Sequence, residues 1–140
     1  MQIFHSDDFD ISLPLGHRFP MEKYGLLRRR VEASALRSTC TLKIPREAKD
    51  QELLTVHTPQ YLNRVITGSL SPKEIRKTGF PWSIDLVERS RRSVGGTVEG
   101  SRAALKEGIA VTLSGGTHHA FSDRGEGYCV FNDVAVATRL

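Results

Sequence analysis

The chain has 140 residues, of which 39% are hydrophobic and 26% are charged, and its formal net charge at pH 7 is +4. This composition is ordinary for a soluble globular protein, and the length suits one small domain with its own core. No apolar run reaches about 18 residues, which excludes a transmembrane helix, and the amino terminus lacks the basic and long apolar regions of a signal peptide, so we expect a cytoplasmic protein.

The distribution of charge and cysteine excludes further classes of protein. The excess positive charge gathers in Arg28–Arg30 and in a second arginine cluster, which comprises Arg89, Arg91 and Arg92. Both clusters fall in helical patterns without a nucleic-acid-binding motif, so we interpret them as solvated helix faces and expect no direct nucleic-acid binding, although the charge can attract an acidic partner. Cys40 and Cys129 are far apart and form no CxxC pair, so neither a disulfide framework nor a zinc ribbon is expected.

The amino-terminal part of the chain predicts two short strands, each followed by a helix. The strands are expected at 2–5 and 39–44, and the loop over 11–20 contains two prolines and a glycine. A helix is expected at 21–36, because apolar residues recur there at spacings of three and four. These residues are Tyr24, Leu27, Val31 and Ala35. A second helix is expected at 47–56.

Capping residues mark the next two helices. Thr58 and Ser71 have N-cap side chains, and each is followed by a proline suited to the first helical turn. Gly68 and Gly79 end these helices, because glycine adopts the left-handed C-cap conformation without strain.

Ser83 begins a long helix that is expected to extend to Lys106 and to end at Gly108. Its expected apolar face comprises Val87, Val94, Val98 and Leu105. The helix also contains three glycines, Gly95, Gly96 and Gly100. Each glycine costs about 1 kcal/mol relative to alanine, so the three indicate either a close approach of another backbone or a local break.

The carboxyl-terminal segment predicts a strand, a loop and a helix. Residues 109–113 (IAVTL) form a nearly continuous apolar run, which suits a strand buried on both faces of a parallel sheet. A loop rich in glycine and histidine follows over 114–127, and Asn132-Asp133 can cap a last helix at 134–140. The alternation of helices with buried strands indicates an α/β fold.

The last predicted helix carries no stop signal, and its residues Val134–Ala137 are apolar. A helix that follows a parallel strand normally leads to another parallel strand, so we interpret the sequence as interrupted within a domain. We therefore expect an exposed sheet edge through which the chain can self-associate.

The segment with the densest chemistry is Ser114–Asp133, directly after the predicted parallel strand. Ligand crevices of open α/β sheets lie beyond the carboxyl ends of strands, so this position suits an active site. The adjacent imidazoles of His118 and His119 can act as general acid and base, and a carboxylate or carbonyl behind each ring would fix its tautomer. Gly115 and Gly116 allow the backbone to approach a ligand closely.

Other interpretations of this segment stay open. An adjacent histidine pair in a loop is more often exposed or structural than catalytic. The pair alone is not expected to bind zinc, because neighbouring side chains diverge and zinc needs three or four convergent ligands. His5, His17 and His57 form no HxH or HExxH pattern, and the Gly-Gly turn lacks the Lys-Ser/Thr of a phosphate-binding loop.

The residues GGTHHA at 115–120 and GYCVFNDVAVA at 127–137 closely resemble the long, specific signature of the histone deacetylase family, which includes acetoin-utilisation proteins and acetylpolyamine amidohydrolases. PLGHRFP at 14–20 and VHTPQYL at 56–62 resemble the family's first loop and its VHxxxYL element. GFPWS at 79–83 resembles the bacterial, class IV-like branch of the family.

The resemblance covers essentially the whole chain, yet only about the first half of a family catalytic domain. It implies an arginase/deacetylase-like fold, a parallel sheet flanked by helices, present here in its first half only. Residues 1–140 would be the amino-terminal part of a single deacetylase domain, truncated after the first helix that follows the His-His loop.

The resemblance also implies roles in catalysis and substrate binding. Of His118 and His119, one would act as general base on a zinc-bound water and the other as electrostatic partner or acid. The Gly127 carbonyl would accept the substrate amide N–H. Tyr128, where many relatives carry Phe, would form a wall of the acyl-lysine tunnel.

Three further residues are expected near the site. Gly116 belongs to the Gly-Gly turn before the histidines. Cys129 lies near the metal in the family but is not a ligand, and we interpret it as a small buried hydrophobe. Lys23 falls where many relatives carry a cation near an internal product channel, and a solvated helix lysine is the open alternative.

The family's zinc ligands are an Asp-x-His pair on the next strand and a later Asp, and a still later Tyr stabilises the oxyanion; this chain contains none of them. Asp123 and Asp133 are not substitutes, because Asp133 is more simply a helix cap. Zinc is therefore expected as the cofactor of the complete domain, with no metal ligand in this chain.

The implied function is zinc-dependent hydrolysis of N-acetyl groups from lysine side chains or small amines, for which this chain alone would be inactive. One alternative is a non-catalytic truncated product or an interaction module that needs a second chain. Another is a metal-independent binding protein for acylated ligands.

Overall fold

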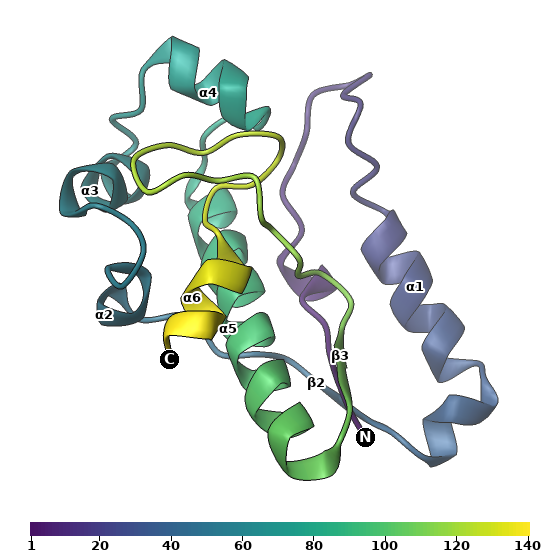
Figure 1. Ribbon diagram of the computed structural model, residues 1–140. Coiled ribbons are helices and arrows are strands. Elements are labelled where there is room, and N and C mark those ends of the chain that lie inside the picture. Colours follow the sequence, from purple (N-terminus) through teal and green to yellow (C-terminus); the bar gives the residue numbers. More distant parts are fainter.

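The computed structural model describes residues 1–140 and contains a sheet of three short parallel strands (Figure 1). The central strand β1 (Gln2–Phe4) pairs on one side with β2 (Thr41–Lys43) and on the other with β3 (Ala110–Thr112). All three strands therefore end at the same edge of the sheet. This arrangement, with helices on both faces, confirms the expected α/β class and the partial arginase/deacetylase-like fold.

Six α-helices and two 3-10 turns surround the sheet. In chain order they are η1 (Asp7–Phe9), α1 (Lys23–Glu32), η2 (Ala35–Ser38), α2 (Asp50–Leu53), α3 (Pro59–Thr67), α4 (Pro72–Thr78), α5 (Ile84–Glu107) and α6 (Asp133–Arg139). None of these helices combines the length and the hydrophobicity that crossing a bilayer requires.

Consecutive residues of β1 point into opposite layers, as the pleat of a strand requires. Ile3 packs with Val31 of α1 and with Cys40 on one face of the sheet. Phe4 faces α5 on the other, where a methyl group added at Gly100 would lie 3.8 Å from the Phe4 ring. The sheet is thus one layer between α1 and α5.

The main hydrophobic core lies on the α5 side, where α3, α5 and α6 meet. Tyr61 of α3 and Phe131, just before α6, are its largest fully buried side chains. The Tyr61 hydroxyl donates a 2.7 Å hydrogen bond to the backbone carbonyl of Val130. This contact ties the segment that follows the His-His loop to α3.

The predicted caps of α3, α4 and α5 are confirmed. Thr58, Ser71 and Ser83 each accept a hydrogen bond from the backbone N–H three residues further along. Gly68 and Gly79 have φ angles of 72° and 86°, the left-handed conformation expected at the ends of α3 and α4.

The three glycines inside α5 do not break the helix. A methyl group at Gly95 would overlap the backbone carbonyl oxygen of Arg46, so α5 packs directly against the chain after β2 at this point. Close approach, rather than a local break, therefore explains at least this glycine.

Several predicted boundaries are wrong. The predicted helix over 21–36 is divided, because Ser34 caps the separate turn η2 by accepting from the Leu36 N–H. Its residues Leu27 and Ala35 are exposed. Helix 47–56 shrinks to the four residues of α2, after which the chain turns and the His57 N–H donates to the Leu53 carbonyl.

Two predicted burial patterns are also wrong. Leu105 is 88% exposed, because the end of α5 extends beyond the core that buries Val87, Val94 and Val98. The strand at 109–113 is not buried on both faces: Ile109 and Val111 are exposed, because β3 lies at the edge of the sheet.

Candidate functional site

The His-His loop, residues 113–132, connects the end of β3 to α6. Figure 1 shows this yellow-green segment extending past α3 and α4 before α6 returns against α5. It begins at the carboxyl-terminal edge of the sheet, where β1 also ends, which is the edge expected for a ligand site.

Backbone contacts with α3 and α4 hold this loop in place. The Thr58 N–H donates to the Ser122 carbonyl, and the N–H groups of Gly127 and Tyr128 donate to the last carbonyls of α4, with N···O distances of 2.9, 3.1 and 2.8 Å. Buried His57 accepts a 3.1 Å hydrogen bond from the Asn132 N–H through Nε2. Burial lowers the pKa of His57, which suits an imidazole that accepts and stays neutral.

His118 and His119 are exposed and lie side by side, with ring centroids 4.3 Å apart and ring planes tilted by 39°. The expected divergence of neighbouring side chains is therefore wrong here. Neighbouring side chains diverge in a regular strand, whereas the two histidines lie in an irregular loop that follows the left-handed residue Gly116, whose φ is 88°. The loop thus brings two imidazoles into contact.

The Gly116 carbonyl fixes the tautomer of His118. Nδ1 of His118 lies 2.8 Å from this oxygen. A carbonyl only accepts, so Nδ1 carries the proton and the neutral ring keeps its lone pair on Nε2. One of the two histidines therefore presents a base from an exposed ring, which is the carbonyl arrangement that the sequence suggested.

The residues after the histidines form a tight turn against them. A methyl group at Gly127 would lie 3.3 Å from the His119 ring, so this turn packs on the imidazole. The Gly127 carbonyl has a partner within the chain, the Cys129 thiol at 3.6 Å. Burial raises the pKa of Cys129, so it stays a thiol and packs as the expected small buried group.

Tyr128 is held in a strained conformation that directs its ring toward an aromatic wall. It is the one non-glycine residue with a positive φ, 65°. Its ring centroid lies 5.0 Å from that of Phe19 and 5.2 Å from that of Phe80. His17 supports this wall through both of its ring nitrogens. Its Nε2 lies 2.9 Å from the Gly79 carbonyl oxygen, and its Nδ1 accepts a hydrogen bond from the Phe19 N–H.

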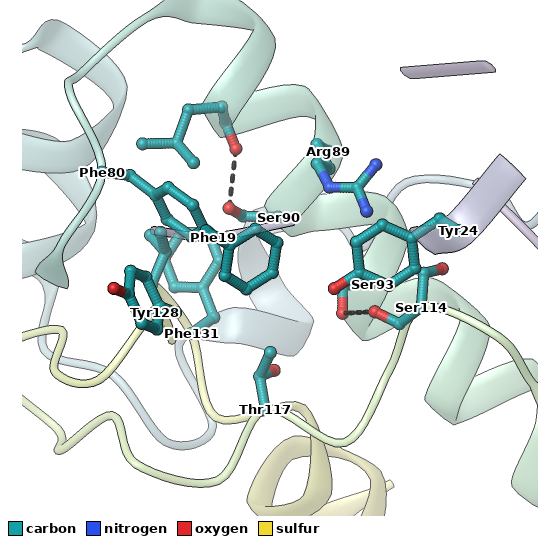
Figure 2. Close-up of a pocket in the computed structure, with 12 residues that line it drawn as sticks. Phe19, Tyr24, Phe80, Arg89, Ser90, Ser93, Ser114, Thr117, Tyr128 and Phe131 are labelled. Atoms are coloured by element: carbon teal, nitrogen blue, oxygen red, sulfur yellow. Dashed lines mark hydrogen bonds between the residues drawn. The ribbon is translucent and has the colours of Figure 1, made fainter. Parts of the chain in front are cut away.

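A cavity of about 40 Å³ lies behind the aromatic wall (Figure 2). Figure 2 shows Phe19, Phe80 and Tyr128 on one side of it and Arg89, Ser93 and Ser114 on the other. The complete lining is Phe19, Tyr24, Phe80, Leu86, Arg89, Ser90, Ser93, Ser114, Thr117, Tyr128, Val130 and Phe131. A volume of roughly 10–15 Å³ admits one water molecule, so the cavity has room for a few.

Arg89, rather than Lys23, is the cation that lines this cavity. Its Nη1 donates to Asp10 Oδ1 at 2.7 Å and to the Ser6 carbonyl at 3.1 Å, and the side chain is buried. Lys23 is exposed, and its Nζ lies 4.4 Å above the Phe19 ring. The interpretation of Arg89 as part of a solvated helix face is therefore wrong; its place three residues after buried Leu86 was the sequence signal for burial.

Asp133 is also placed differently from the expectation. Asn132, not Asp133, caps α6, because its side chain accepts from the Ala135 N–H. The Asp133 carboxylate is fully buried and accepts instead from Gly116 N–H of the His-His loop and from the Thr97 hydroxyl. Sequence spacing alone cannot separate a cap from its neighbour.

One group of side chains in the structure could hold a cation, and it lies outside the His-His loop. It comprises His5, Asp7 and Asp8, after β1. Asp7 is already paired, since its Oδ2 accepts from Arg28 Nε at 2.7 Å and its Oδ1 lies 2.9 Å from His5 Nδ1.

Comparison with known proteins identifies the family of this chain. The model of the histone deacetylase domain matches residues 17–140, which include both histidines and the turn at Gly127. The chain belongs to the histone deacetylase family.

Two relatives match almost the whole chain, and a third matches about two thirds of it. An uncharacterised protein of Picosynechococcus is 37% identical over 98% of the chain, and histone deacetylase 2 of Arabidopsis thaliana is 29% identical over 97% of it. The acetoin utilization protein AcuC of Bacillus subtilis is 34% identical over 66% of the chain. The chain spans 46%, 38% and 27% of these three relatives, respectively, and thus less than half the length of each.

Proposed function

We propose that this chain carries the proton-transfer histidines of a zinc-dependent deacetylase that hydrolyses N-acetyl groups on lysine side chains or small amines. The observation that carries the proposal is the pairing of His118 with the Gly116 carbonyl, which leaves Nε2 basic on an exposed ring beside His119. Family membership supports the reaction class. We propose the cytoplasm as its location.

The proton chemistry follows from the two imidazoles. Amide hydrolysis needs a base that removes a proton from the attacking water and an acid that delivers a proton to the departing amine. Imidazole exchanges protons readily near neutral pH, and a positioned acid or base contributes roughly 10²–10⁴-fold to the rate. His118 Nε2 would take the proton from water, and His119, in ring contact with it, would stabilise the resulting charge or act as the acid.

The residues of this chain do not form a zinc site at the histidine pair. The two rings supply two nitrogens that we assign to proton transfer, and a zinc site needs at least three convergent protein ligands. We propose that zinc binds to ligands outside these 140 residues.

Substrate binding would use the aromatic wall and the turn after the histidines. Tyr128 and Phe19, which pack against the buried ring of Phe80, present an apolar surface suited to the aliphatic chain of an acylated amine. The Gly127 carbonyl, in the turn that packs on the His119 ring, would accept the substrate amide N–H in addition to the Cys129 thiol, because a carbonyl oxygen has two lone pairs. Lys23 would add positive charge at the outer side of the wall.

The test is to join the chain, by fusion or in trans, to the rest of a family domain and to measure deacetylation of an acetyl-lysine peptide and of an acetylpolyamine. We expect activity on at least one of them. Tyr128→Ala should raise KM more than it lowers kcat, because the ring lines the substrate path and moves no proton. Absence of activity from a folded, zinc-loaded assembly would contradict the proposal.

A specific surface also favours the second candidate, a module that needs further polypeptide. Leu105 and Val134 are 88% and 44% exposed beside the groove between α5 and α6, and the edge of β3 is open. Since the relatives are more than twice as long as their matched parts, we propose that the remainder of the domain covers this surface. An inactive but stable complex with that remainder would favour a non-catalytic module.

A further inference from the structure

The Tyr128 ring lies against a glycine at the end of α4. Gly79, the C-cap of α4, has a φ of 86°, and a methyl group added to it would lie 2.8 Å from Cε1 and 3.0 Å from Cδ1 of the Tyr128 ring. Ordinary van der Waals contacts between such atoms are 3.4–4 Å long. The ring therefore occupies space that a side chain at position 79 would fill.

The backbone of Tyr128 is fixed at the same helix end. Its N–H donates to the Thr78 carbonyl at 2.8 Å, and the Gly127 N–H donates to the Lys77 carbonyl at 3.1 Å. Tyr128 also has a φ of 65°, a conformation that a non-glycine residue keeps only where its surroundings hold it. A contact at position 79 would therefore be relieved by the Tyr128 ring rather than by the main chain.

Aromatic side chains restrict the directions in which this ring can move. Its centroid lies 5.0 Å from that of Phe19, 5.2 Å from that of Phe80 and 6.2 Å from that of His17. Figure 2 shows Phe19 and Phe80 beside Tyr128. Tyr128 nevertheless remains 38% exposed. A group at position 79 would therefore displace the ring toward its exposed side, which is the side that a substrate can reach.

The carbonyl of Gly79 fixes a second part of the aromatic wall. His17 Nε2 lies 2.9 Å from this oxygen, and a carbonyl only accepts, so Nε2 carries the proton. His17 Nδ1 then accepts from the Phe19 N–H at 3.2 Å. Gly79 thus contacts the Tyr128 ring directly and is linked to Phe19 through His17.

We propose that Gly79 is a positioning residue for substrate binding: because it has no side chain, the Tyr128 ring lies against α4 and leaves the path of the acylated amine open. A side chain at position 79 would push the ring into that path and weaken binding of the aliphatic chain. The inference rests on the proposed function, in which Tyr128 lines the substrate path. Gly79 acts through Tyr128 and moves no proton.

The experiment uses the chain joined to the rest of a family domain. Gly79→Ala is made in the parent, in Tyr128→Phe, which keeps both ring carbons that face Gly79, and in Tyr128→Ala, which removes the ring. Gly108→Ala is the matched control for backbone strain, because Gly108 ends α5 with a φ of 87° and a methyl group there would meet nothing within 4 Å. If Gly79→Ala does not fold, Gly79→Asn carries the test, because asparagine tolerates the left-handed C-cap.

Three quantities are measured on each variant. KM and kcat are determined with an acetyl-lysine peptide. Kd is determined with a fluorescein-labelled peptide in which a methyl ketone replaces the acetyl amide, so that it cannot be hydrolysed. The urea midpoint reports the packing of the ring on Gly79 without any substrate.

Side chains in contact couple by roughly 2- to 150-fold, so Gly79→Ala should raise KM and Kd by at least about threefold and leave kcat within about twofold of the parent. The same rise is expected in Tyr128→Phe and none in Tyr128→Ala, because a missing ring cannot be displaced. Gly79→Ala should also lower the urea midpoint more in the parent than in Tyr128→Ala. Gly108→Ala should leave KM and Kd unchanged.

Unchanged KM and Kd in folded Gly79→Ala would overturn the proposal, and so would an equal rise in the Tyr128→Ala background, because the effect would then not pass through the ring. Equal losses of urea midpoint with and without the Tyr128 ring would contradict it even in a protein without turnover. Failure of the deacetylase proposal differs from these results, because the parent itself would then show no turnover while the midpoints still couple Gly79 to Tyr128.

Discussion

Replacement of Gly95 by alanine should destabilise the protein although alanine is the better helix former. Gly95 lies in the middle of α5, and its added methyl group would overlap the Arg46 carbonyl oxygen and lie 3.0 Å from the carbonyl carbon. The segment that would have to move is fixed. Arg92 Nη1 donates to the Pro45 carbonyl, and the Ala48 N–H donates to the Arg91 carbonyl, each at 3.0 Å.

The magnitude follows from three contributions. Overpacking a rigid site costs about 1–3 kcal/mol. Displacing the segment weakens one or two hydrogen bonds, each worth about 1 kcal/mol. Alanine restores about 1 kcal/mol of helix propensity. The free energy of unfolding should therefore fall by about 1–4 kcal/mol.

Gly100→Ala is the matched control in the same helix. Its methyl group would meet only the Phe4 ring, at 3.8 Å, which is an ordinary van der Waals distance. We expect it to stabilise the protein by up to about 1 kcal/mol. The assay is the urea midpoint by far-ultraviolet circular dichroism at one fixed protein concentration. Equal midpoints for the two variants would refute the close-packing argument.

Three further predictions concern the core, the loop and the open surface. Tyr61→Phe should lower the free energy of unfolding by about 1–3 kcal/mol, because the buried Val130 carbonyl loses its donor; an unchanged urea midpoint would contradict this. Burial lowers the pKa of His57 in the folded protein, so the free energy of unfolding should have its full value above the unfolded pKa of about 6.5 and should decrease by up to about 1.4 kcal/mol for each pH unit below it. His57→Gln should flatten this pH dependence in urea titrations, and a parent protein whose stability does not change over this pH range would refute the assignment. Finally, the isolated chain should associate as its concentration rises, since Leu105, Val134 and the β3 edge are uncovered; light scattering that finds a monomer at every concentration would be evidence against this.

Local sequence signals predicted the helices that have both caps. Ser71, with proline after it, and Gly79 define α4 within one residue, because their hydrogen bonds and backbone angles involve neighbours only. Another local signal, the spacing of apolar residues, failed to predict the end of the helix expected at 21–36. There the periodic apolar pattern continued, but Ser34 captured the backbone and began a separate turn.

Tertiary placement could not be predicted from these signals. Arg89 belongs to an arginine cluster that suggests an exposed face, yet its guanidinium is buried because Asp10 and the Ser6 carbonyl, 79 and 83 residues earlier, come together around it. The sequence does not distinguish Asp133 from a helix cap, because its contact with the Gly116 N–H depends on how the His-His loop folds back against α6. Contacts between distant segments decide both positions.

The candidate site was predicted mainly from family resemblance. The sequence alone placed a histidine pair after a strand, and the structure adds the ring contact and the carbonyl behind His118. The structure places the Tyr128 ring beside those of Phe19 and Phe80, and its role as a wall of an acyl-lysine tunnel stays a prediction. The catalytic roles of His118 and His119 stay predictions until activity is measured.

The most direct test of the central claim is kcat for His118→Ala and His119→Ala in the chain joined to the rest of a family domain, with bound zinc measured on the same samples. Loss of proton transfer should lower kcat by roughly 10²–10⁴-fold while the zinc content stays that of the parent, because neither ring is assigned as a ligand. Near-full kcat in the variants, or loss of their zinc, would contradict the account.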